Sequence, residues 1–160
     1  MVVIRGTQKL LRWFPPAESV NEPSTTRLGD WYGHLLHFGT TRIALFISER
    51  SRLPVLLPGR DLGRIAIHLP IGLQQVLLAM QIPTDLVHAE LAAMSNVLFA
   101  PTNSRSLLGT INDFTNLLDW ELDQNPRAHL LDLSLKLSQS PVKPLGYSNP
   151  ATVTVEIFRT

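Results

Sequence analysis

Polar side chains that can bind anions recur at helical spacing in residues 101–119. If this segment is helical, one side carries an arginine, a glycine and two asparagines within about 60° of one another, flanked by two aspartates: Arg105, Gly109, Asn112, Asn116, Asp113 and Asp119. Glycine costs about 1 kcal/mol against alanine inside a helix, and asparagine is a poor helix former, so these residues are unusual on a plain solvated face. Glycine allows a ligand to approach closely, asparagine offers a donor and an acceptor, and a guanidinium group suits a phosphate or carboxylate.

This pattern predicts a site for RNA or another anionic ligand at the start of the helix. The predicted binding residues are Asn103, Ser104, Arg105, Gly109, Asn112, Asp113 and Asn116. A catalytic version would be a metal-independent ribonuclease of the toxin kind. In such an enzyme Arg105 would stabilise the phosphate charge, and Glu90 or a histidine would move the proton. The sequence alone leaves open whether the protein is an enzyme.

The same residues have two other possible uses. They can form the docking surface of a non-catalytic, regulatory module that binds another protein. They can also form a structural network, in which Arg105 pairs with Asp113 or Asp119, Gly109 marks a close helix crossing and the asparagines hold a loop. The variant Arg105→Ala separates these hypotheses. It should abolish anion binding with little loss of stability at a ligand site, but destabilise the fold strongly if it breaks a buried pair.

The helix that carries these residues is well marked at both ends. Thr102, Asn103 and Ser104 can each accept a hydrogen bond from free backbone N–H groups, so the helix is predicted to begin near Ser104. It is predicted to end before Asn125-Pro126. One side forms a regular apolar stripe that should face the core: Leu107, Ile111, Phe114 and Leu118.

The remaining chain predicts an α+β domain spanning residues 1–160, in which a small, mainly antiparallel sheet packs against helices between residues 62 and 122. Strands are expected at residues 2–4, 42–47 and 152–158, and at the sheet edge for 55–57, because prolines flank that segment. A further strand is expected at 131–137, where leucines alternate strictly with polar residues, although leucine also favours helices. Helices are expected from Asp30, from 72 to 80 and from Pro83 onwards, the last with Leu86, Ala89, Ala93 and Met94 turned inward.

Several functional classes lack their marks in this sequence. There is no cysteine, which removes disulfides, thiolate zinc sites and cysteine nucleophiles. Nucleophile elbows, phosphate loops and dinucleotide fingerprints are also missing, so no cofactor is predicted. His34 and His37 would share one side of a helix and could form part of a metal site, but the sequence supplies no identifiable third ligand. No metal site is therefore predicted.

Charge is unevenly distributed although the net charge is only +1. Residues 1–60 contain eight Lys or Arg against four Asp or Glu, whereas residues 61–160 contain six against nine. Such an asymmetry can orient the protein towards an anionic partner. No signal peptide and no apolar run of membrane-spanning length stand out, so the expectation is a cytoplasmic protein without a membrane partner.

Several short segments resemble the signature blocks of a small, uncharacterised prokaryotic protein family. They are TQKLL at residues 7–11, LGDWY at 28–32, FISER at 46–50, TNSRS at 102–106 with Gly109 and NDF at 112–114, and PLGY at 144–147 with Pro150. The block from TNSRS to NDF is the most specific, and the similarity spans nearly the whole chain. The resemblance implies a bacterial source and a single domain that stands alone, and it brings no reaction with it.

Overall fold

A five-stranded mixed β-sheet forms the centre of the protein in the computed structural model, which describes residues 1–15 and 19–160. The strand order is β4-β3-β2-β1-β5; β1 is parallel to both β2 and β5, whereas β3 is antiparallel to both β2 and β4. The strands are β1 Val2–Gly6, β2 Trp31–Phe38, β3 Thr41–Ser48, β4 Pro54–Pro58 and β5 Val97–Pro101. The helices are α1 Gln8–Leu11, η1 Gly59–Arg64, α2 Ile65–Ala79, α3 Thr84–Ala93, α4 Arg105–Gln124, α5 Leu130–Ser138, η2 Lys143–Leu145 and α6 Pro150–Arg159.

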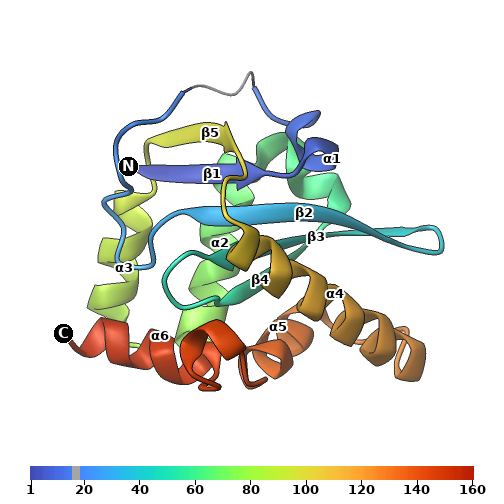
Figure 1. The fold of residues 1–160 in the computed structure, drawn as a ribbon. Helices are drawn as coiled ribbons and strands as arrows, with labels where there is room; N and C mark the ends of the chain where they lie inside the picture. Colours follow the sequence, from blue (N-terminus) through green and yellow to red (C-terminus); the bar gives the residue numbers. More distant parts are fainter. Residues whose placement is uncertain (16–18) are drawn as a thin grey trace.

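Helices cover both faces of this sheet, and each face has its own hydrophobic core (Figure 1). Helices α2 and α3 pack on one face against residues such as Ile4, Trp31 and Phe46. Helices α4 and α5 pack on the other face against residues such as Tyr32 and Leu45. The hairpin of β2 and β3 extends to one side of the molecule, and α4 crosses in front of these strands in Figure 1. A side chain on β2 therefore faces one helical layer or the other, according to its position.

The predicted α+β class is confirmed, and so are three of its strands. Residues 2–4 and 42–47 lie within β1 and β3, and residues 55–57 lie within β4 at the edge of the sheet, as expected from the flanking prolines. The run in β3 is nearly continuous in apolar residues because both of its faces are buried between helices. The expected helices at residues 72–80 and from Pro83 onwards correspond to the second half of α2 and to α3.

Three sequence-based predictions of secondary structure are wrong, and one strand is missed. The segment from Asp30 forms strand β2 and not a helix, because five of its residues are buried between the two layers and no alternation marks a strand. Residues 131–137 lie in α5. Leu130, Leu133 and Leu137 follow helical spacing, so this leucine-rich segment fits a helix as well as it fits a strand. Residues 152–158 form α6 and do not join the sheet. Strand β5 carries no alternation and was not predicted.

The structure of α6 shows why residues 152–158 were misassigned. The β-branched residues there favour strands. However, Asn149 Oδ1 accepts a hydrogen bond from the Thr152 amide at 2.8 Å, and Pro150 occupies the first helical turn. Pro150, Thr154 and Phe158 are the buried residues, at helical spacing. Local capping and tertiary packing therefore outweigh the strand propensity.

The buried side of α3 also differs from the prediction. Met94 is buried as expected, and Leu86 is half-buried, but Ala89 is exposed. Val87 and Glu90 are the buried residues within the helix. Glu90 therefore lies in the core and not on the surface of the helix.

The helical segment Gly59–Ala79 passes a test of length and composition for membrane spans, with a mean hydropathy of 1.3 over 18 residues. The segment is not an uninterrupted apolar run, because it contains Arg60, Asp61 and Arg64, and the expectation of no membrane partner stays a prediction. In the structure, 33% of this window is buried, and Leu69, Leu73 and Leu77 pack into the core beneath the sheet. Helices in a protein core are often as apolar as membrane spans, because their apolar side chains pack against other elements of the fold.

Candidate anion site at the start of helix α4

The first turn of α4 is capped by a side chain. Ser104 is the N-cap residue, and its Oγ accepts the Leu107 amide at 3.2 Å. The predicted start of the helix and its core stripe of Leu107, Ile111, Phe114 and Leu118 are confirmed. Within the part of the chain that the structure describes, the amides of Arg105 and Ser106 meet no acceptor. A helix start of this kind carries partial positive charge.

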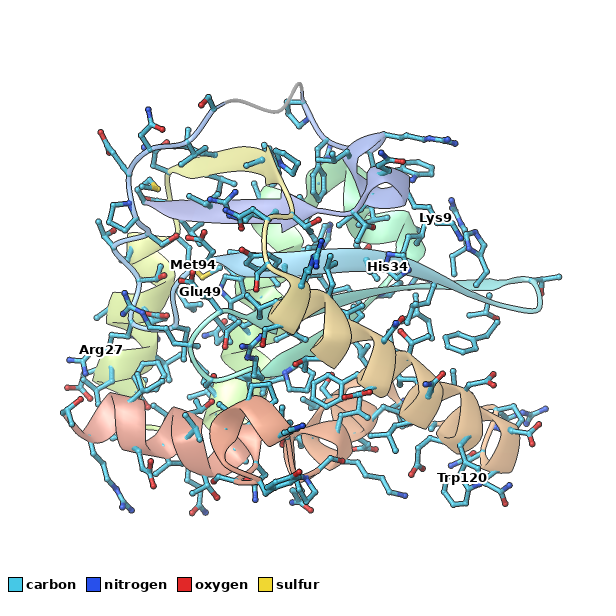
Figure 2. All side chains as sticks on the ribbon, in the orientation of Figure 1. Lys9, Arg27, His34, Glu49, Met94 and Trp120 are labelled. Carbon is cyan, nitrogen blue, oxygen red and sulfur yellow. The ribbon has the colours of Figure 1, made fainter. Side chains whose placement is uncertain are left out.

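The polar stripe on α4 is open surface. Its members are all exposed: Arg105, Gly109, Asn112, Asp113 and Asn116. Among the described residues no ion pair joins Arg105 to an aspartate, and a Cβ placed on Gly109 would have nothing within 4 Å. The structure therefore has neither the pairing nor the close helix crossing that a structural network would need. The stripe continues to Trp120, which Figure 2 shows near the other end of α4.

Arg52 approaches the start of α4 from the turn between β3 and β4. Its backbone is in the left-handed region, with φ of 60°, and its Nη2 donates to Ser106 Oγ at 3.0 Å. Its Nη1 is buried and has no hydrogen-bond partner among residues 1–15 and 19–160. Burial lowers the pKa of Arg52, while Tyr32 and Glu49 act in the opposite direction. The guanidinium group thus faces the helix start with one donor nitrogen unused.

Tyr32 connects the sheet to the residues just before α4. Its hydroxyl donates to Asn103 Oδ1, and burial raises the pKa of this hydroxyl. Asn103 itself is exposed. Because Tyr32 lies on the face of β2 that α4 covers, the hydroxyl orients the Asn103 amide at the edge of this layer.

Arg5 and Asp30 fix the strand ends beneath this point. Arg5 stands beside Tyr32 in the parallel pair of β1 and β2, and its Nε donates to Asp30 Oδ2 at 2.8 Å. Its Nη1 donates to the Pro101 carbonyl at 3.1 Å, and Ser24 Oγ donates to Asp30 Oδ1 at 2.6 Å. These bonds hold the end of β5, and therefore the residues that lead into α4, in one position.

We call the group formed by Arg52, Asn103, Ser104, Arg105 and Ser106 the α4 cluster. It joins the predicted binding residues 103–105 to Arg52, which the sequence analysis missed. The signal for Arg52 was slight, because a single arginine in a charged turn resembles ordinary surface. What distinguishes Arg52 is the fold, which directs its guanidinium group to the first turn of a helix 54 positions away in sequence.

Residues 3–153 match a family model described as a domain of unknown function, DUF6933. The chain belongs to the DUF6933 family. No curated protein and no solved structure matches it. The expected resemblance to an uncharacterised family is confirmed in this respect, whereas the bacterial source stays a prediction. Membership in DUF6933 assigns no reaction, so function must be argued from the geometry of this chain.

The predicted catalytic partner Glu90 lies on the other side of the DUF6933 sheet from Arg105. It belongs to α3, which packs in the core opposite α4. Its side chain is buried, with Oε1 and Oε2 accepting the amides of Arg27 at 2.7 Å and Leu28 at 3.1 Å. Burial raises the pKa of Glu90, and these two amides act against that rise. Glu90 therefore anchors a loop, and the expected pair of Arg105 and Glu90 is not assembled.

The two histidines considered for a metal site point to opposite faces of the DUF6933 sheet. His34 and His37 lie three apart on strand β2, and that spacing reverses the side of a strand. His34 Nδ1 is in hydrogen-bond contact with Thr7 Oγ1 at 2.7 Å. Burial lowers the pKa of His34, and nearby Lys9 and His37 lower it further. The described residues contain no cluster of three side chains suited to a metal.

Proposed function

We propose that this DUF6933 protein recognises a phosphate-bearing ligand, RNA among the candidates, at the α4 cluster. The observation that carries the proposal is the Arg52 guanidinium group, which a hydrogen bond to Ser106 holds beside the start of a long helix and whose Nη1 has no acceptor among the described residues. The exposed Arg105 adds a second guanidinium group on the first turn of the same helix.

The local electrostatics favour an anion over a cation. The helix start contributes partial positive charge, and Arg52 and Arg105 contribute two full charges. Arg5 is balanced by Asp30, so this pair adds little net field. A guanidinium group can bind either a phosphate or a carboxylate through two parallel hydrogen bonds, but a phosphate has enough oxygens to accept from two guanidinium groups at once.

The proposal is one of recognition and not of cleavage. Phosphodiester cleavage needs a proton acceptor near the phosphate. Glu90 is committed to two backbone amides on the far face of the sheet, and His34 is engaged with Thr7. A binding function needs only the groups that the α4 cluster already brings together.

Inorganic pyrophosphate tests this proposal, because it has phosphate chemistry without a base. We expect pyrophosphate to raise the melting temperature of the wild type and to bind Arg105→Ala at least about tenfold more weakly. Without ligand, Arg105→Ala should melt within about 2 °C of the wild type, since its side chain is exposed and unpaired among the described residues. Arg127→Ala, at an exposed arginine beyond the far end of α4, is the matched control.

Two results would contradict the phosphate proposal. One is a wild type that shows no stabilisation by pyrophosphate. The other is equal stabilisation of wild type and Arg105→Ala, which would locate the anion elsewhere.

A second candidate function is protein docking on the exposed side of α4. The polar stripe ends in two exposed apolar residues, with Leu117 exposed to 39% and Trp120 to 59%. Exposed tryptophan is typical of binding hot spots. A photo-crosslinker placed at Asn116 should capture one protein partner in cells, whereas the same group at Gln75, exposed on α2 on the other side of the sheet, should not. Equal capture at both positions would count against docking.

A further inference from the structure

A basic groove lies on the face of the sheet opposite α4. It has a volume of about 380 Å³ and runs between the turn that follows α1 and the hairpin of β2 and β3. Its lining residues are Lys9, Arg12, Trp13, Leu35, His37 and Arg42, which we call the Trp13 groove. Figure 2 shows Lys9 beside α1, at the side of the molecule towards which the hairpin extends.

The charge of this groove is entirely of one sign among its described lining residues. Lys9, Arg12 and Arg42 are all exposed, and no described acidic side chain lines the groove with them. A neighbouring hollow shares Arg42 and contains a further cation, Arg60 of η1, but Leu122 of α4 and Leu130 of α5 also line it. The nearest acidic residue of η1, Asp61, lies 3.8 Å from His68. Much of the positive excess of residues 1–60 is therefore concentrated here.

Acidic side chains end the positive surface on the other side of the hairpin. The hollow there shares His37 with the Trp13 groove, but it is also lined by Asp119 and Asp123 of α4. These carboxylates repel a polyanion, so they confine it to the α1 side of the hairpin. The positive surface of the groove is therefore limited to the α1 side of the hairpin.

Trp13 offers an aromatic surface inside this positive field. Its side chain is 44% exposed, although large aromatic side chains usually bury. The Arg42 guanidinium carbon lies 5.1 Å from the centre of the Trp13 ring, which holds a planar cation over the indole. The residues on either side of Trp13 are held in place. Leu10 is buried in the core, and Phe14 packs on Phe99 with ring centres 4.7 Å apart.

We propose that the Trp13 groove binds a single strand of nucleic acid. Phosphates would lie against Lys9, Arg12 and Arg42, and a base would stack at Trp13 and the Arg42 plane. Proteins that bind single strands without sequence preference combine a positive groove with aromatic stacking platforms in this way. A peptide of Asp and Glu residues alone would use the charges but carries no aromatic ring to stack on the indole, so the exposed Trp13 favours the nucleic acid.

The test measures fluorescence anisotropy of a labelled oligouridine of about ten nucleotides at low and at physiological salt. The double variant Arg12→Gln with Arg42→Gln should bind about tenfold or more weakly, with a salt dependence reduced by about two phosphate contacts. Trp13→Ala should weaken binding by about fivefold or more while leaving the salt dependence unchanged. The matched control, Arg127→Gln with Lys143→Gln, removes two exposed cations elsewhere and should bind like the wild type.

Polyglutamate of similar charge provides the competing arm. We expect it to compete only weakly with oligouridine, and we expect Trp13→Ala not to change its effect. The proposal is overturned if the wild type does not bind oligouridine at low salt, if the control pair loses as much affinity as the groove pair, or if Trp13→Ala binds oligouridine normally. All of these residues differ from the α4 cluster, so this failure and a failure with pyrophosphate are distinguishable.

Discussion

At the scale of single residues, the most informative positions are polar groups whose partners lie far away in sequence. Arg52 reaches Ser106, Tyr32 reaches Asn103, and Glu90 reaches the amides of Arg27 and Leu28. The α4 residues could be predicted because one helix brings them together at regular spacing. Arg52 could not, because its place beside them depends on the path of two strands and a turn.

Glu90 gives a first prediction about stability. Glu90→Ala leaves the amides of Arg27 and Leu28 without an acceptor, and the Leu28 bond is buried. We expect a loss of about 2 kcal/mol or more in the free energy of unfolding, measured by urea denaturation. The matched control is Glu121→Ala, which breaks an exposed pair with Lys136 and should cost less than about 1 kcal/mol. Similar losses in the two variants would show that Glu90 does not anchor the loop.

His34 gives a prediction about pH. Because burial lowers its pKa in the folded state, the unfolded chain takes up a proton at a higher pH than the folded protein does. The stability contributed by neutral His34 is complete above pH of about 6.5 and is lost as the pH falls through the lowered folded pKa. Melting temperatures between about pH 7.5 and 5.5 should therefore decline less in His34→Asn than in the wild type. His88→Asn, at an exposed helical position, should decline as the wild type does.

At the scale of elements, the sequence indicates an element well where one periodicity has no competitor. The long α4 has a cap, a regular core stripe and a clear end, and β3 is an uninterrupted apolar run between turns. Strand β2 is covered on both faces and has no alternation, so it resembles a short buried helix. In α5, alternate leucines satisfied both periodicities. Packing decided between them, with Leu133 and Leu137 buried against the sheet.

Two glycines have contrasting surroundings, because Gly33 lies in the packed core and Gly109 lies on open surface. A Cβ on Gly33 of β2 would lie 2.4 Å from Phe46 Cε1 and 2.5 Å from Leu10 Cδ2, both in the buried core. Gly33→Ala should therefore destabilise the fold by about 1–3 kcal/mol. Gly109→Ala meets nothing within 4 Å on α4, and should stabilise the protein by about 0.5–1 kcal/mol. Thermal and urea unfolding of the two variants measure both effects.

The same Gly109 variant also tests why the helix keeps a costly residue. If a ligand approaches the backbone one turn after Arg105, Gly109→Ala should be more stable than the wild type but should bind pyrophosphate less tightly. Unchanged pyrophosphate affinity would mean that the glycine has no part in the α4 cluster.

At the scale of the whole molecule, the sheet separates two positively charged surfaces. The α4 cluster lies on the layer of α4 and α5, whereas the Trp13 groove lies on the layer that contains α2 and α3. Among the described residues the two surfaces share none, and effects of distant sites without common partners are usually additive. Charge counted along the chain could predict an anionic partner, but not that the cations of residues 1–60 would divide between two faces.

Because the sheet separates the two surfaces, the two proposals together predict that pyrophosphate and oligouridine bind independently of each other. The groove pair Arg12→Gln with Arg42→Gln should bind pyrophosphate within about twofold of the wild type, and Arg105→Ala should bind oligouridine within about twofold. Combining all three changes should reduce each affinity only by the amount that its own site loses, as measured by titration calorimetry and anisotropy. A larger loss in the combined variant would mean that one ligand spans both faces around the β2–β3 hairpin, because coupling between the sites requires a shared occupant or a shared movement.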